Sequence, residues 1–132
     1  MTNTLLRTET VQYGEIELVV ETATLLTEVE KAELRDRLDQ QVQRGKRYLG
    51  AFLDVLVQTR KAKGLGFTLP TVSTPDEALL KAFEQFLKLP IPMISDWTTA
   101  CAVVNVPLGV NKDLQPGAPQ DSPLPSADAS SS

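Results

Sequence analysis

The sequence predicts a mainly helical α+β domain that begins with a small β-hairpin and ends in a disordered tail. Residues 4–21 alternate as strands do, and residues 27–62, 75–89 and 92–105 carry apolar residues at helical spacing, with a loop at 64–73. Residues 111–132 are rich in Pro, Ser and Ala and contain no aromatic residue, so they cannot offset their ordering entropy by burial. With 42% hydrophobic and 23% charged residues, the 132-residue chain is typical of one small domain, which we place at residues 1–110.

The N-terminal hairpin is predicted at about residues 4–21, which are rich in Thr, Val, Ile and Glu. Ile16, Leu18 and Val20 lie at every second position, as in a strand with one buried face. The Tyr-Gly-Glu sequence at 13–15 is the expected turn. Because a two-stranded hairpin is only marginally stable alone, its apolar face must pack against the helices.

A long helix is predicted at about residues 27–62. Thr27 and Glu30 have the spacing of a capping box. Gly45 either interrupts the helix or weakens it by about 1 kcal/mol. Three cations before Gly64 are typical of a last helical turn and its stop. The apolar residues that recur near one face are Val29, Leu34, Leu38, Val42, Tyr48, Leu49, Phe52, Leu53, Leu56 and Val57, and the three cations are Arg60, Lys61 and Lys63.

Two further helices are predicted at about residues 75–89 and 92–105. Thr74, Pro75 and Glu77 form a helix-start signal, and Pro90 with Pro92 ends the first of the two helices. The apolar faces of these helices carry Leu79, Leu80, Phe83, Phe86 and Leu87, then Met93, Ile94, Trp97, Ala100, Cys101 and Val104.

The composition excludes several functional classes. The net charge of -4 argues against a general polyanion binder, because phosphate affinity needs clustered Lys and Arg. The chain has no His and a single cysteine, Cys101, so internal disulfides, the usual metal sites and a His-activated thiol are excluded. We therefore expect no catalytic, cofactor-binding or metal-binding residues, and we expect no enzyme. No signal peptide or membrane-spanning run is evident, so a soluble cytoplasmic protein is expected.

Two local motifs have weak functional interpretations. Gly64-Leu65-Gly66 lacks the lysine of a phosphate loop, so a turn is the better account. The cations at 44–47 and 60–63 either touch RNA or an acidic partner, or form a solvated helix end, which suits an acidic protein better.

The order of several short motifs resembles a known family. Leu6-Arg7-Thr8-Glu9 opens the hairpin, a Glu-rich helix follows, Gly50-Ala51-Phe52-Leu53 lies within a helix, and Asp76-Glu77-Ala78 opens the next one. In this order, and over about residues 4–105, the chain resembles the tail assembly chaperones of lambda-type long-tailed phages. The Pro/Ser/Ala-rich tail is also similar to that family.

The resemblance implies a cytoplasmic protein that binds and solubilises the tape-measure protein and helps recruit tail-tube subunits. It also implies absence from the mature virion and a longer, frameshifted form of the same protein as a further partner. We expect an apolar surface for helices of the tape-measure protein, formed by Tyr48, Phe52, Leu53, Leu56, Phe83, Phe86, Leu87 and Trp97. The same residues are also the natural core of the domain.

Two other functions remain open from the sequence. One is a structural head-completion or tail-completion protein that stays in the virion. The other is a small regulator that binds nucleic acid through Arg44 to Arg47, with binding that depends on salt.

Overall fold

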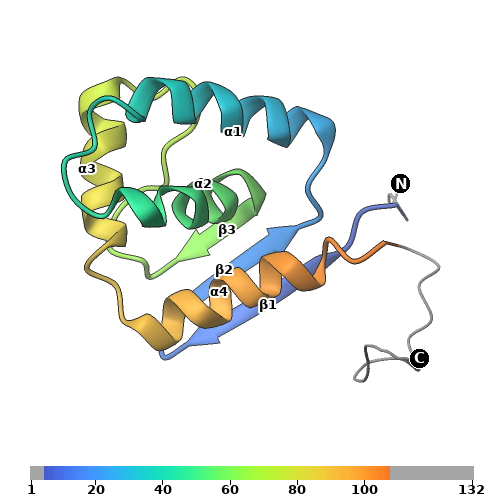
Figure 1. Ribbon diagram of the computed structural model, residues 1–132. Helices are drawn as coiled ribbons and strands as arrows, with labels where there is room; N and C mark the ends of the chain where they lie inside the picture. The colour runs from blue at the N-terminus through green and yellow to red at the C-terminus, as the bar shows by residue number, and fades with distance from the viewer. Residues whose placement is uncertain (1–4, 108–132) are drawn as a thin grey trace, which may run out of the picture.

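The computed structural model describes residues 5–107, and this part of the chain forms four α-helices and a three-stranded antiparallel sheet (Figure 1). The predicted α+β class is confirmed. The predicted tail at 111–132 lies outside the described residues. In chain order the elements are β1 (Thr8–Tyr13), β2 (Ile16–Glu21), α1 (Leu25–Leu38), the 3-10 helix η1 (Lys46–Tyr48), α2 (Leu49–Gln58), β3 (Thr59–Lys63), α3 (Asp76–Phe86) and α4 (Ile91–Val103).

The predicted hairpin is confirmed. Tyr13 pairs with Ile16, and Gly14 between them has φ of +61°, a left-handed conformation that glycine adopts at little cost. Leu18 and Val20 are fully buried, whereas Glu17, Val19 and Glu21 are only half-buried. The alternation in β2 therefore marks one face of the sheet as the core face.

The prediction of one long helix at about residues 27–62 was wrong. The chain leaves α1 after Leu38, turns through Gly45 at φ of +75°, and forms α2 before residues 59–63 extend as β3. Strand β3 pairs antiparallel with β2, so the sheet order is β1-β2-β3. Pairing with the free edge of β2 overrides the helical preference of these residues, a tertiary effect that a local pattern does not contain. The three cations lie on a strand, not on a helix end.

The helix starts also differ from the predicted ones. The capping box of α1 lies one turn earlier than expected: the Thr27 backbone N–H donates to Thr24 Oγ1 over 3.2 Å, and the Thr24 N–H donates to Thr27 Oγ1 over 2.7 Å. Val29, expected on the core face, is exposed, because it lies about 140° around the helix from the buried Leu34. The N-cap residue of α3 is Pro75 and not the expected Thr74, so α3 has no side-chain cap, and Thr74 Oγ1 accepts from the Thr71 N–H over 2.9 Å.

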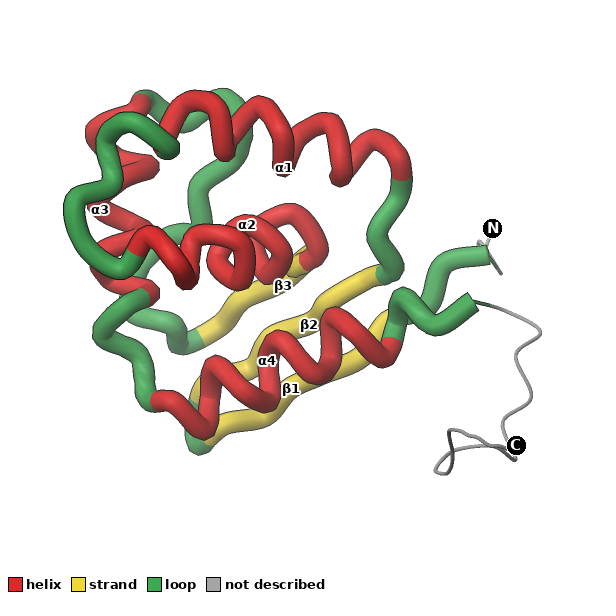
Figure 2. Tube along the Cα trace, viewed as in Figure 1, coloured by secondary structure: helices red, strands yellow, loops and turns green. Residues whose placement is uncertain are grey.

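Helix α2 lies at the centre of the fold (Figure 2). Seven of its ten residues are buried, since α1, α3 and α4 and strand β2 all contact it. Helix α4 covers the core face of the sheet along β1 and β2, and α1 lies on the far side of α2 from the sheet. The opposite face of the sheet is left without a helix among the described residues. Figure 1 also shows that the starts of α1 and β1 and the end of α4 lie at the same end of the molecule.

Candidate partner-binding surfaces

Most of the apolar side chains expected to bind a partner form the hydrophobic core. The ring centroid of Phe52 lies 5.1 Å from that of Phe83 and 5.2 Å from that of Phe86, and Phe86 lies 6.2 Å from Trp97. Burying such rings contributes the largest apolar areas available to a small domain. As folded, these side chains present no surface to a partner. The six expected residues that are at most 6% exposed are Phe52, Leu53, Leu56, Phe83, Phe86 and Trp97.

Tyr48 and Leu87 are the members of the expected set that reach the surface. Tyr48 is 52% exposed, and the Arg47 guanidinium carbon lies 5.6 Å from the centroid of its ring. Leu87 is half-buried beside Gly45, where an added Cβ would lie 3.0 Å from both Leu87 methyl carbons. These two residues alone form too small an area for a stable interface.

Other exposed apolar side chains belong to the start of α1 and the end of α4, which lie at the same end of the molecule (Figure 1). Leu25 and Leu26 in the first turn of α1 are 86% and 65% exposed. We call the apolar end the group formed by Leu25, Leu26, Val29, Val103 and Val106, which make up five of the nine large hydrophobic residues exposed in the described part of the chain. A cleft of about 190 Å³ lies here, lined by Glu28 of α1, by Asp54 and Gln58 of α2, and by residues of α4 that include Ala102.

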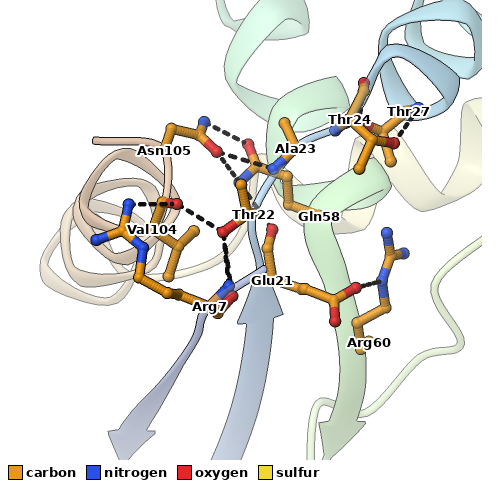
Figure 3. Close-up of polar contacts among 10 residues, drawn as sticks. All are labelled: Arg7, Glu21, Thr22, Ala23, Thr24, Thr27, Gln58, Arg60, Val104 and Asn105. Atoms are coloured by element: carbon orange, nitrogen blue, oxygen red, sulfur yellow. Dashed lines mark hydrogen bonds and ion pairs between the residues drawn. The ribbon is translucent and has the colours of Figure 1, made fainter. Parts of the chain in front are cut away.

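A buried polar cluster fixes the geometry of this end (Figure 3). Gln58, the last residue of α2, is 3% exposed, and its Nε2 donates to the backbone oxygens of Glu21 and Cys101 over 3.1 and 3.2 Å. Its Oε1 accepts from Asn105 Nδ2 over 3.3 Å, and Asn105 Oδ1 accepts from the Ala23 N–H over 2.9 Å. One side chain thus joins the end of β2, the end of α2 and the end of α4.

Arg7 and Thr22 complete this connection on the other side of α4. Thr22 Oγ1 donates to the Val104 carbonyl over 2.7 Å, and Arg7 Nη2 donates to the same carbonyl over 3.0 Å and to that of Val106. The Arg7 cation thereby lies at the negative end of the α4 dipole, a favourable position. Its Nε is buried and has no partner among residues 5–107.

Sequence reasoning missed these polar residues for a physical reason. Gln58 and Asn105 follow apolar runs and carry no motif, and Arg7 entered only as part of a resemblance. The one available signal was a polar residue that directly continues a buried helical face, which Gln58 does after Val57.

A second surface lies beside β3. A groove of about 480 Å³ runs between this strand, the facing parts of α1 and α2, and the loop at 67–72. Arg60 and Lys61 line it, and Lys63 follows them on the same exposed strand. Arg60 Nε lies 3.0 Å from Glu21 Oε1, the one described ion pair that involves β3.

Burial determines the chemistry of the one cysteine. Cys101 is buried, as expected, and burial first and the nearby Asp54 carboxylate second raise the pKa of its thiol to about 12. Among residues 5–107, no three His, Cys, Asp or Glu side chains are placed to hold a metal ion. No helix in the described range has the length and apolar composition needed to span a membrane.

Comparison of the chain with family models, with curated proteins and with solved structures gave no significant match.

Proposed function

We propose that this protein is a tail assembly chaperone of a lambda-type long-tailed phage. In this proposal it binds and solubilises the tape-measure protein in the host cytoplasm, helps recruit tail-tube subunits, and is absent from the mature virion. The order of the motifs at residues 6–9, 50–53 and 76–78 supports the assignment. The observation that carries the binding mechanism is the apolar end.

The apolar end has the chemistry that a helical partner requires. The Gln58 cluster fixes the end of α4, and the Thr24–Thr27 capping box fixes the start of α1, so little ordering entropy is lost when a partner binds. An amphipathic helix recognised in this way places apolar residues at i, i+3 and i+4 against such a surface. Tape-measure chains are long amphipathic helices whose apolar faces need cover until the tube forms.

The charges at this end indicate which residues a partner helix should carry. Glu28 lines the cleft between α1 and α4 and belongs to none of the described ion pairs, whereas Asp54 beside it is paired with Lys31 over 2.6 Å. A partner helix with basic residues beside its apolar face complements this arrangement. The net charge of -4 adds solubility to the complex.

The test is co-expression with the longest coiled-coil-rich protein of the same phage genome. Leu25→Ser combined with Val29→Ser should lower the soluble yield of that protein at least threefold relative to the wild type. The matched control is Ile91→Ser, because Ile91 is 83% exposed and, like Leu25, is the first residue of its helix. The control should leave the yield unchanged.

Two results would count against the proposal. If the soluble yield of the coiled-coil-rich protein is the same with and without the wild-type protein, the chaperone activity is contradicted. Detection of the protein in stoichiometric amounts by mass spectrometry of purified virions would favour the completion-protein alternative instead.

A further inference from the structure

Strand β3 is an edge of the sheet with an open row of backbone groups. It pairs with β2 on one side only, because the strand order is β1-β2-β3. Among residues 5–107, no hydrogen bond outside that ladder reaches the backbone of residues 60–63. Such an edge is a template for a further strand.

The groove beside β3 offers a place for that strand. The core residues Leu34 of α1 and Leu56 and Val57 of α2 form its apolar floor, and Glu30 of α1 also lines the groove. The loop residues Phe67 and Leu69, which are half-buried, form the opposite wall. A strand laid along β3 would direct every second side chain onto this floor and the others to solvent.

The charges of β3 select what pairs with it. Lys63 lies opposite Glu17 in the register with β2, and Arg60, at which the register shifts, is paired with Glu21. Strand β2, with the sequence IELVVE, thus shows that β3 accepts a partner in which acidic and apolar residues combine. Lys61 and Lys63 belong to none of the described ion pairs, so both cations are available to a partner strand.

We propose that the groove beside β3 binds an extended segment of a partner protein, in which acidic and apolar residues alternate, as a fourth strand of the sheet. A second copy of β3 does not fit, because three cations would face three cations. Residues 108–132 of this chain contain four prolines, which lack the N–H that a strand donates. This inference stands independently of the phage assignment.

The test uses the full-length protein labelled with nitrogen-15 and two capped peptides, acetyl-EVEVE-amide and acetyl-KVKVK-amide. Titration with EVEVE should shift the amide resonances of residues 59–63 and 67–72 in a saturable way. KVKVK should bind at least tenfold more weakly, because its charges repel Lys61 and Lys63. Equal affinity for both peptides, or shifts confined to other residues, would overturn the proposal.

Charge reversal provides the matched controls. Lys61→Glu combined with Lys63→Glu should reverse the peptide preference, and Lys61→Glu alone should reduce it if the double variant does not fold. Lys81→Glu combined with Lys88→Glu changes the net charge equally at exposed positions in and just after α3 and should retain the tenfold preference. Loss of the preference in this control would attribute the effect to net charge and contradict the proposal.

Two further outcomes identify other occupants and also overturn it. If the amide resonances of β3 shift when the free protein is diluted, a second copy of the chain occupies the groove. The same shifts caused in the undiluted protein by Asp113→Asn, Asp121→Asn and Asp128→Asn together would show that the chain's own C-terminal segment occupies it.

Discussion

The aromatic core and the apolar end are both rich in hydrophobic side chains, yet they differ in what covers them. Phe52, Phe83 and Trp97 are enclosed by three helices and the sheet. Leu25 and Leu26 sit in a first helical turn that no other described element covers. The difference teaches that apolar periodicity identifies what a helix could bury, whereas the tertiary packing decides which faces remain for partners.

The largest expected effect is in the core. Phe52→Ala removes a ring that touches both Phe83 and Phe86, so it should lower the free energy of unfolding by about 3–5 kcal/mol. Tyr48→Ala at the surface should cost about 1 kcal/mol or less. Urea unfolding measures both values, and Phe52→Leu replaces the alanine variant if that variant is unfolded. Similar losses for Phe52→Ala and Tyr48→Ala would erase the distinction between core and surface.

A smaller loss is expected at the polar cluster that joins the two regions. Gln58→Ala leaves the buried carbonyl of Cys101 and the partly buried carbonyl of Glu21 without this donor and should cost about 1–3 kcal/mol. The matched variant is Gln43→Ala, at an exposed position, which should change stability by no more than about 0.5 kcal/mol. Chemical denaturation of both variants decides whether this cluster holds the end of α4 in place.

The stability contributed by the ion pair next to the loop at 67–72 should depend on pH. Arg37 Nε lies 2.6 Å from Asp76 Oδ1, and its Nη1 donates to the Val72 carbonyl over 2.8 Å. The hydrogen bond from Arg37 to the Asp76 carboxylate lowers the pKa of Asp76 from its ordinary 3.8. Desolvation opposes this shift, and the charge of Arg37 adds to it.

Because the pKa of Asp76 is lowered on folding, the carboxylate stabilises the fold above pH 3.8 and loses this effect as the pH falls through the folded-state value. Asp76→Asn should therefore be less stable than the wild type at pH 6, and the gap should narrow below pH 3.8. Glu77→Gln in the same helical turn serves as the control and should show a smaller gap. A gap for Asp76→Asn that stays constant with pH would contradict the ion pair.

The smallest effect on stability is expected at the apolar end. Leu25→Ser removes a side chain that is 86% exposed, so the free energy of unfolding should change by about 0.5 kcal/mol or less. Thermal unfolding of the purified variant checks this value. A loss above about 1.5 kcal/mol would mean that Leu25 packs within the fold and is unavailable to a partner.

Local patterns were sufficient for part of the fold. The turn at Gly14, the burial of Leu18 and Val20, and the burial of Cys101 follow from alternation and helical spacing within single elements. Helices α3 and α4 also lie within about three residues of their predicted bounds, because Pro90 separates them and Pro92 lies in the first turn of α4.

The rest depends on contacts between distant residues. Residues 59–63 have no strand alternation, and they extend because β2, about 40 residues earlier, offers an unpaired edge. The capping box of α1 forms at Thr24 and not at Thr27 as predicted, and Val29 is exposed because it lies about 140° around the helix from the buried Leu34. The exposed surface could not be chosen from the sequence, since the aromatic residues are equally suited to a core and to an interface.

Hydrogen exchange of the purified complex with the tape-measure protein tests the central claim most directly. The account predicts slower amide exchange at residues 25–30 and 100–106 in the complex than in the free protein, with unchanged exchange in α2 and α3. The contradictory result is unchanged exchange at these two segments together with faster exchange in α2 and α3. That outcome would mean that the partner opens the fold and binds the aromatic core instead of the apolar end.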